Sequence, residues 1–173
     1  AIYLQDPDGN GVEVYADFPE NKWVKIHDEI LMSTNPLDFE NLLAIKEQDW
    51  KTASEDVLLG HVHLSVRYLD ASVAFYHLLG FDTVLDIQHA VFLSSKKYHH
   101  HLACNIWNMR NAKVHQKDQI DMEYAEITYP NQLEFLHVKK MLQENNKDYT
   151  ESNNEIFVHD PNGILFILRC EEK

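Results

Sequence analysis

The sequence predicts an α+β fold of two paired βαβββ modules, preceded by a hairpin that is left from a truncated third module. Two observations lead to this prediction. A strand–turn–strand segment in residues 1–17 reappears near the end of the chain, and the order strand, helix, three strands occurs twice after the first copy. A βαβββ unit leaves an apolar sheet face to be covered, so two units together can bury a common core.

The two hairpins share an Asp-Pro-x-Gly turn, at residues 6–9 and 160–163. Proline fixes its own φ and keeps the residue before it extended, and glycine takes the positive φ that a tight turn needs. The copies lie 160 − 6 = 154 residues apart. At this offset Glu13 of the first copy corresponds to Ile167 of the second. A carboxylate within an apolar strand therefore stands where the later copy has an apolar residue.

Residues 18–57 read as a connector with a short helical pattern, which Asn35 or Asp38 could cap. The first module follows, at about 58–110. It contains a strand over 57–66, a helix over 71–79 that Asp70 caps and Gly80 ends, and strands over 81–87, 90–94 and 101–107.

The second module occupies about 120–173. It begins with a strand over 123–129, and Asn131 caps a helix over 132–144. Three strands follow, over 147–150, 155–159 and 165–170. Residues 58–173 thus form the main body of the predicted fold.

Composition limits the partners of the chain. Its net charge of −13 argues against nucleic acid or an anionic membrane as a partner. With two cysteines and no signal peptide, a cytoplasmic location is expected. The chain opens at Ala1 inside a strand pattern, so we expect a fragment of a longer protein. Its exposed module edges could pair to give a homo-oligomer.

Three motifs occur in a fixed order along the chain: the Asp-Pro-Asp-Gly-Asn-Gly hairpin with Trp23 after it, Gly-His-Val-His-Leu at 60–64, and Tyr-His-His-His-Leu at 98–102 running on to Asn-Ile-Trp. Together they resemble the vicinal oxygen chelate superfamily, which includes glyoxalase I, bleomycin-resistance proteins and extradiol dioxygenases. Within it, the chain resembles the C-terminal part of bacillus-type catechol 2,3-dioxygenases.

The resemblance implies an enzyme of aromatic degradation that uses Fe(II) and O₂ to cleave a catechol-like diol. A 2-His-1-carboxylate triad leaves open positions for both substrates. Residue by residue, His61 matches the ligand histidine of a first strand and Glu13 the carboxylate ligand, while the third ligand would precede Ala1. The fragment is therefore expected to be inactive, with Fe(II), Mn or no metal bound. Tyr124 and Ile167 take the ligand positions of the last module, where no metal is expected.

A histidine beside a bound diol could act as an acid–base residue, because its pKa suits proton transfer near neutral pH. His99, His100 and His101 are the candidates, and the sequence does not choose among them. If strand alternation starts at His99, then His99 and His101 share a face. These two are the catalytic candidates, and Tyr124 is a third, as a hydrogen-bond donor to substrate oxygen.

Simpler interpretations exist for the same residues. His61 with His63, and Glu13, could be polar positions on solvated strand faces. Tyr124 could be a buried core tyrosine. Two other functions also fit the fold: a glyoxalase-like metalloenzyme, or a metal-free module of the resistance type that binds a small planar ligand. The order of the motifs weighs against a glyoxalase. Tyr124 and Ile167 stand where metal ligands are expected, which favours metal-free ligand binding for the last βαβββ unit alone.

Overall fold

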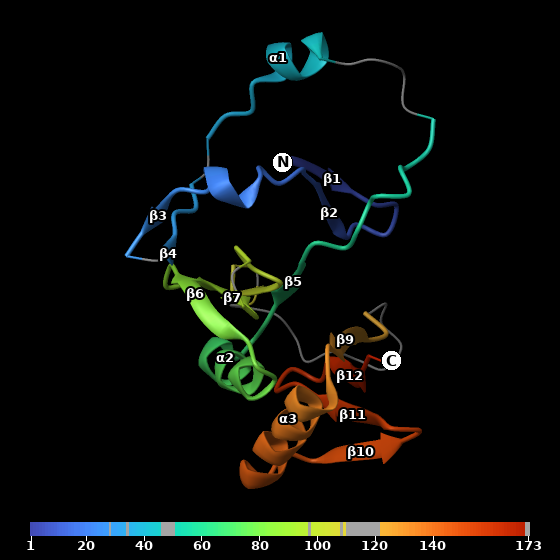
Figure 1. Ribbon diagram of the computed structural model, residues 1–173. Coiled ribbons are helices and arrows are strands. Elements are labelled where there is room, and N and C mark those ends of the chain that lie inside the picture. Colours follow the sequence, from blue (N-terminus) through green and yellow to red (C-terminus); the bar gives the residue numbers. More distant parts are fainter. Residues whose placement is uncertain are drawn as a thin grey trace. The chain divides into compact units, whose positions relative to one another are not determined.

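The computed structural model describes residues 1–27, 29–33, 35–45, 51–96, 98–107, 109 and 122–171. The chain forms two compact units, an N-terminal unit of residues 1–58 and a C-terminal unit of residues 59–173 (Figure 1). None of the described helices has the length and apolar character needed to cross a membrane.

The N-terminal unit starts with an antiparallel hairpin of β1 (Ile2–Gln5) and β2 (Gly11–Val14). A 3₁₀ turn, η1 (Glu20–Lys22), and a short pair of strands, β3 (Lys25–Ile26) and β4 (Glu29–Ile30), follow within the stretch that was predicted as a connector. The short helix is α1 (Phe39–Ala44). Of the two predicted caps, Asp38 is the one observed, because its Oδ1 accepts a hydrogen bond from the backbone N–H of Asn41 at 3.0 Å.

The C-terminal unit contains two modules of the same order. The first module comprises β5 (Val62–Ser65), α2 (Leu69–Leu78), β6 (Asp82–Asp86), β7 (Ala90–Ser94) and β8 (Leu102–Asn105); the second comprises β9 (Ala125–Tyr129), α3 (Gln132–Glu144), β10 (Tyr149–Ser152), β11 (Glu155–His159) and β12 (Leu165–Cys170). Their strand orders are β5-β8-β7-β6 and β9-β12-β11-β10, and in each sheet the first two strands run parallel. The predicted pair of βαβββ modules is confirmed.

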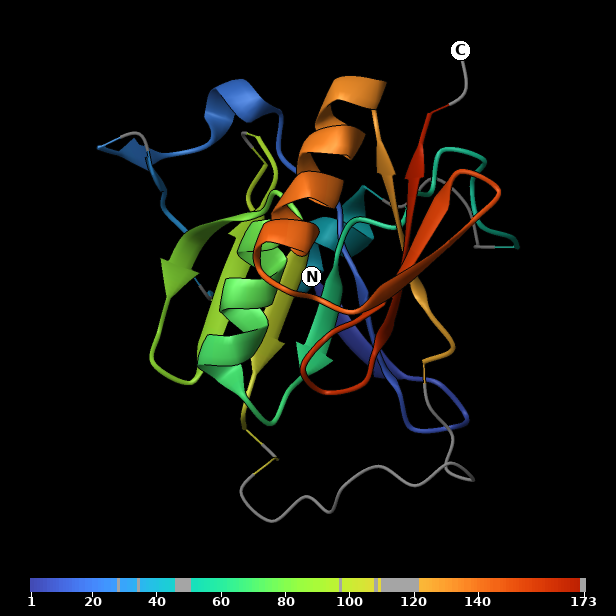
Figure 2. The ribbon, with the colours of Figure 1, turned by 90° about the horizontal axis from the view of Figure 1, so that it is seen from below.

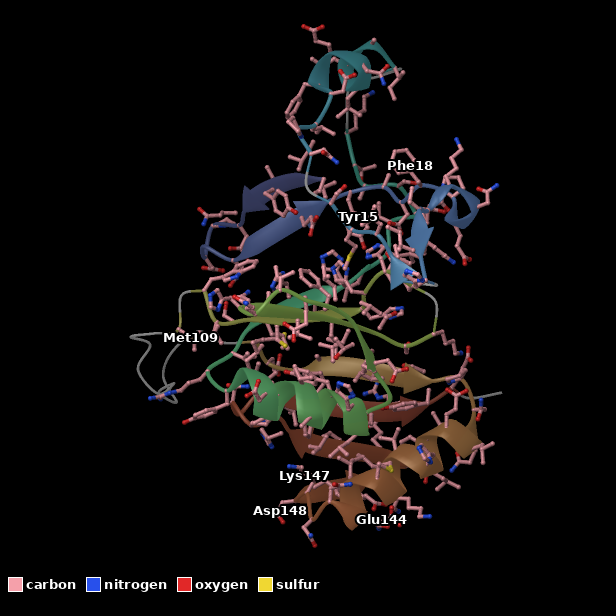
Figure 3. All side chains as sticks on the ribbon, turned by 90° about the vertical axis from the view of Figure 1, so that its left-hand side faces the viewer. Tyr15, Phe18, Met109, Glu144, Lys147 and Asp148 are labelled. Atoms are coloured by element: carbon pink, nitrogen blue, oxygen red, sulfur yellow. The ribbon has the colours of Figure 1, made fainter. Side chains whose placement is uncertain are left out.

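The helices differ in how well the sequence located their ends. Helix α3 has the predicted bounds, and the side chain of Asn131 accepts a hydrogen bond from the backbone N–H of Glu134 at 3.0 Å. Figure 3 shows the end of this helix, at Glu144, and the turn at Lys147 and Asp148 that leads to β10. Helix α2 begins at Leu69, two residues before the predicted start, so the prediction of Asp70 as its cap is wrong. Asp70 lies in the first turn, where a carboxylate is also favourable.

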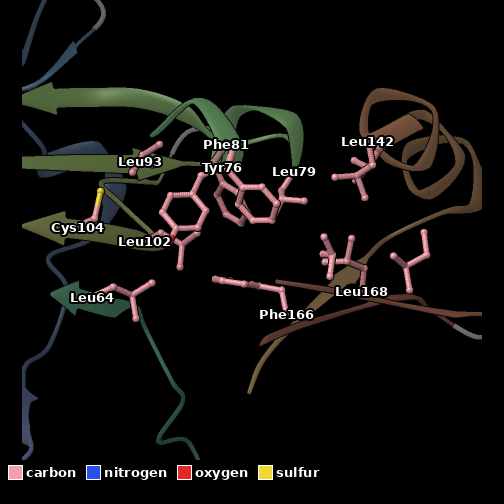
Figure 4. Close-up of a cluster of buried hydrophobic side chains, with 14 of the residues drawn as sticks. Leu64, Tyr76, Leu79, Phe81, Leu93, Leu102, Cys104, Leu142, Phe166 and Leu168 are labelled. Carbon is pink, nitrogen blue, oxygen red and sulfur yellow. The ribbon is translucent and has the colours of Figure 1, made fainter. Parts of the chain in front are cut away.

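A single hydrophobic core joins the two modules. Helices α2 and α3 lie side by side (Figures 1 and 2). The rings of Phe75 and Tyr76 on α2 lie 6.2 and 5.6 Å from that of Phe166 on β12, measured between centroids. Figure 4 shows Tyr76 and Phe166 within this core. The residues of each sheet that face its helix belong to this core, among them Leu64, Leu93, Leu102, Val158 and Leu168. The opposite side of each sheet, here called its open face, is left for other contacts.

Hydrogen bonds also link the two modules. The buried hydroxyl of Tyr76 donates to Oδ2 of Asp160, and that of Tyr129 donates to the backbone oxygen of Leu79, both at 2.8 Å. Asn162 of the second module reaches α2 through its side chain, which bonds to Oγ of Ser72 at 2.8 Å. The two modules are therefore held together by polar as well as apolar contacts.

The repeated Asp-Pro turn has the same hydrogen bonds in both copies. The N–H of Gly9 donates to the oxygen of Asp6, and that of Gly163 to the oxygen of Asp160, each at 3.0 Å. Gly9 and Gly163 have φ values of +87° and +93°, as the motif predicted. The surroundings differ, because Asp6 is partly accessible in its hairpin while Asp160 is only 5% exposed.

Candidate histidine site

Two of the predicted site residues, His61 and His99, lie beside the open face of the first module's sheet. Strand alternation turns Leu64, Leu93 and Leu102 toward α2, so their neighbours point the other way. His63 pairs with Ala103 across β5 and β8, and Ala103 pairs with Phe92 across β8 and β7. These three residues form one row on the open face, with a small side chain between two rings.

His63 of this row and three neighbouring histidines, His61, His99 and His100, form a group that is here called the histidine cluster. His61 precedes β5, and His99 and His100 precede β8. Because β5 and β8 pair in parallel, the starts of the two strands come together. The ring centroids of His61 and His100 are 4.2 Å apart, and those of His61 and His99 are 6.2 Å apart. Nδ1 of His99 lies 2.8 Å from Nδ1 of His100.

The surroundings of His100 favour its neutral form. Burial, followed by the charges that His61, His99 and other neighbouring histidines would carry, lowers the pKa of His100 to about 3. The ring of His100 is therefore neutral at physiological pH. In a neutral imidazole one nitrogen has an available lone pair. This neutral form of the ring is the one that binds metal ions.

His101 turns away from the cluster to a second polar contact. Its Nδ1 accepts a hydrogen bond from the N–H of Ser95 at 3.2 Å and lies 3.1 Å from Oγ of Ser94. Burial and the neighbouring His99 lower the pKa of His101. The alternation that we predicted from His99 does not occur, because strand β8 begins only at Leu102.

The second module presents different residues at the corresponding positions. Tyr124 precedes β9 and is 45% exposed, so it is not a buried core tyrosine. Ile167 is buried on β12, between Glu126 on β9 and Phe157 on β11. Arg169 forms ion pairs with Glu126 at 2.7 Å and with Glu155 at 2.6 Å.

Glu13 lies on β2 of the N-terminal unit, and His61 lies in the C-terminal unit. Glu13 pairs with Tyr3 across the hairpin, as Ile167 pairs with Phe157, so the predicted offset of 154 residues holds in the strand register. Burial, and then a hydrogen bond to Glu13 and the charge of Glu13, raise the pKa of Tyr3. Glu13 is thus partly enclosed within its hairpin.

Within the part of the chain that the structure describes, no group of three or more His, Cys, Asp or Glu side chains is arranged to hold a metal ion. The chemistry of the predicted donors does suit Fe(II), because imidazole and carboxylate are the ligands of the facial triad.

The sequence analysis missed Asn105, which lies on the open face of β8 and is 5% exposed. Its Oδ1 accepts a hydrogen bond from the N–H of Trp107 at 3.1 Å, and its Nδ2 lies 2.8 Å from Nε2 of His63. An amide at the end of an apolar strand was the signal that could have identified it, because a buried polar group needs partners.

Comparison with known proteins extends these findings. The chain matches no protein-family model. Over 166 residues, 93% of the chain, it is 37% identical to the catechol-2,3-dioxygenase of Bacillus subtilis (strain 168), and it spans 58% of the length of that protein.

Two solved structures show the same fold. A glyoxalase/dioxygenase from Nostoc punctiforme has a TM-score of 0.54 and 11% identity, covering 74% of this chain and 100% of its own. A glyoxylase/bleomycin resistance protein/dioxygenase domain from Frankia sp. EAN1pec has a TM-score of 0.50 and 11% identity, covering 70% and 100%. The predicted resemblance to this superfamily and to catechol 2,3-dioxygenase is confirmed.

Proposed function

We propose that this chain, which has the vicinal oxygen chelate fold, is part of a non-haem Fe(II) dioxygenase that cleaves catechol-like aromatic diols beside their hydroxyl groups. The histidine cluster carries the proposal, because it contains His61, which the family resemblance assigns as a metal ligand. The chain spans 58% of the Bacillus subtilis relative, so the activity belongs to the longer protein in this proposal.

His61 and Glu13 would hold the metal together with a third ligand from outside these 173 residues. Bound Fe(II) would supply neighbouring positions for the diol and O₂. Two ligands alone bind a metal weakly, so the 173-residue chain by itself should turn over little or no catechol.

His99 is the residue we assign to proton transfer. The centroid of its ring lies 6.2 Å from that of His61, the residue assigned as a metal ligand. An imidazole beside a bound diol can take a proton from its hydroxyl group. His100 instead stays neutral and orients His99 through the 2.8 Å contact of their Nδ1 atoms.

The aromatic residues around the cluster suit a planar substrate. The ring of His63 lies 5.9 Å from that of Phe92 and 5.2 Å from that of Trp107, and Phe92 also lies 5.1 Å from His100. Stacked and edge-on contacts with such rings favour a flat aromatic ligand. The catalytic roles of His101 and Tyr124, the cytoplasmic location and the homo-oligomer stay predictions.

The test uses the full-length protein, loaded with Fe(II) without air and then given catechol and O₂. The yellow ring-fission product and O₂ uptake measure turnover, and bound iron is measured separately. His61→Ala and Glu13→Ala should each abolish turnover and reduce iron content. His99→Gln should lower kcat while iron content stays unchanged.

His137→Ala is the control, because His137 is exposed on α3 and should keep wild-type turnover. Wild-type activity in His61→Ala or Glu13→Ala would refute their role as ligands. Absence of ring cleavage in the iron-loaded wild type would refute the proposed function and favour the metal-free binding module.

A further inference from the structure

The amide of Asn105 has a fixed orientation. Its Oδ1 receives a hydrogen bond from the backbone N–H of Trp107 at 3.1 Å. A backbone N–H can only donate, so the oxygen end of the amide must face it. The NH₂ end is therefore the one that lies 2.8 Å from Nε2 of His63.

This orientation decides where the proton of His63 resides. An amide NH₂ group donates hydrogen bonds and does not accept them, so Nε2 of His63 must be the acceptor. Its lone pair is then occupied, and the single N–H of the neutral ring is on Nδ1. In this state neither ring nitrogen offers a lone pair to a metal ion.

We propose that Asn105 is a positioning residue that holds His63 in the Nδ1–H tautomer, and so makes His61 the metal-binding histidine of this strand. The assignment of the His63 tautomer does not depend on the proposed function, whereas the selection of His61 as the metal-binding histidine rests on it. Alternate residues of a strand share one face, so His61 and His63 would otherwise compete for the same ion. The contact between His63 and Asn105 removes that competition.

The second module shows that this contact belongs to a fixed position in the fold. His63 pairs with Ala103, two residues before Asn105, and Glu126 pairs with Ile167, two residues before Arg169. Asn105 and Arg169 thus occupy the same position, and Arg169 contacts Glu126 at 2.7 Å. In each module the residue two positions after the row makes a polar contact with the first strand, and among the described residues the histidine cluster lies beside this contact in the first module.

The tautomer can be measured in the metal-free 173-residue chain with ¹⁵N-labelled histidine. Long-range ¹H–¹⁵N spectra distinguish the two neutral tautomers, and His63→Gln identifies the signals of His63 by their loss. We expect the hydrogen of His63 on Nδ1. In Asn105→Asp, whose carboxylate only accepts, Nε2 should gain a hydrogen. Asn146→Asp, an exposed control, should leave the pattern unchanged.

A hydrogen on Nε2 of His63 in the wild type, or an unchanged pattern in Asn105→Asp, would overturn the tautomer assignment. The second measurement adds Zn²⁺ to the wild type and to Asn105→Ala. In the wild type the nitrogen signals of His61 should shift while those of His63 stay. In Asn105→Ala both should shift. A shift of His63 in the wild type, or none at His61 in either chain, would overturn the selection of His61.

The tautomer measurement and the test of ring cleavage can fail independently of each other. A full-length protein without ring cleavage would leave the tautomer result standing. A hydrogen on Nε2 of His63 would overturn the inference even in an active dioxygenase.

Discussion

The two modules of the C-terminal unit share their strand order and their parallel first pair, yet their open faces carry different chemistry. The row His63, Ala103 and Phe92 in the first corresponds to Glu126, Ile167 and Phe157 in the second. The residues that face the helices are apolar in both modules. The helix-facing positions therefore determine the fold, and the open face determines the chemistry, so a likeness in fold does not assign a site.

The largest effect should come from the shared core. Phe166 belongs to the second module, but its ring packs against Phe75 and Tyr76 of the first. Phe166→Ala should lower the free energy of unfolding by roughly 3 to 5 kcal/mol, because a large buried ring is replaced by a cavity. Urea unfolding followed by near-UV circular dichroism measures this loss.

Both modules should lose stability in one transition. Leu133→Ala is the control, since Leu133 is 79% exposed on α3 and should change the free energy of unfolding by less than about 0.5 kcal/mol. Two separate transitions in Phe166→Ala would show that the modules do not share one core.

The repeated turn gives a matched pair of substitutions. Asp160→Ala removes the acceptor of the buried Tyr76 hydroxyl and of the N–H groups of Asn162 and Ile164. The free energy of unfolding should fall by about 2 to 4 kcal/mol, because buried donors lose their partners. Asp6→Ala removes the same turn bonds from an accessible hairpin, where water can replace them, and should lower the free energy of unfolding much less than Asp160→Ala does. Equal losses in urea unfolding would contradict this account.

The histidine cluster should make the first module sensitive to acid. The pKa of His100 is lowered in the folded state, so the unfolded state binds the proton more readily. The stability that His100 gives is present above about pH 6.5 and is lost as the pH falls toward the folded value of about 3. After allowance for solvent screening, about 1 to 2 kcal/mol should be lost.

Thermal unfolding between pH 7.5 and 4.5 tests this dependence. His100→Gln should flatten the fall of the melting temperature with decreasing pH. His137→Gln, on the exposed side of α3, should keep the wild-type slope. A His100→Gln variant with the same acid sensitivity as the wild type would mean that other groups cause it.

The smallest effect should come from the ion pairs of the second module. Arg169 bridges Glu126 and Glu155, and all three side chains are partly exposed. Arg169→Met should lower the free energy of unfolding by about 0.5 to 1 kcal/mol at low salt, and the difference should shrink as salt screens the charges. Urea unfolding in low and high NaCl measures both values.

Lys140→Met provides the comparison, because its pair with Glu144 is longer, at 3.6 Å, and more exposed. It should have almost no effect at either salt concentration. A loss in Arg169→Met that does not depend on salt would point to packing of the arginine side chain.

Features determined by neighbouring residues could be predicted from the sequence. Helix α3 and its Asn131 cap were predicted with the observed bounds, and so were the turns at Gly9 and Gly163. These features depend on residues within a few positions of one another, where capping and positive-φ preferences act.

Features that depend on distant residues could not be predicted in this way. The segment before α2 is bonded to Asn162, and the meeting of His61 with His100 depends on the pairing of β5 with β8. The contact between Asn105 and His63 has the same origin. Of the predicted iron ligands, His61 lies in this cluster, and the pairing of Glu13 with it stays a prediction.

The segment that leads into helix α2 is bonded to the far end of the chain. The cap residue, Tyr68, makes no side-chain capping bond, and just before it the N–H of Arg67 donates to Oδ1 of Asn162 at 2.8 Å, across 95 residues of sequence. During synthesis, the first module therefore leaves the ribosome before this bond can form. Contacts of such long range slow folding. The first module should thus stay incompletely folded on the ribosome until the last hairpin has emerged.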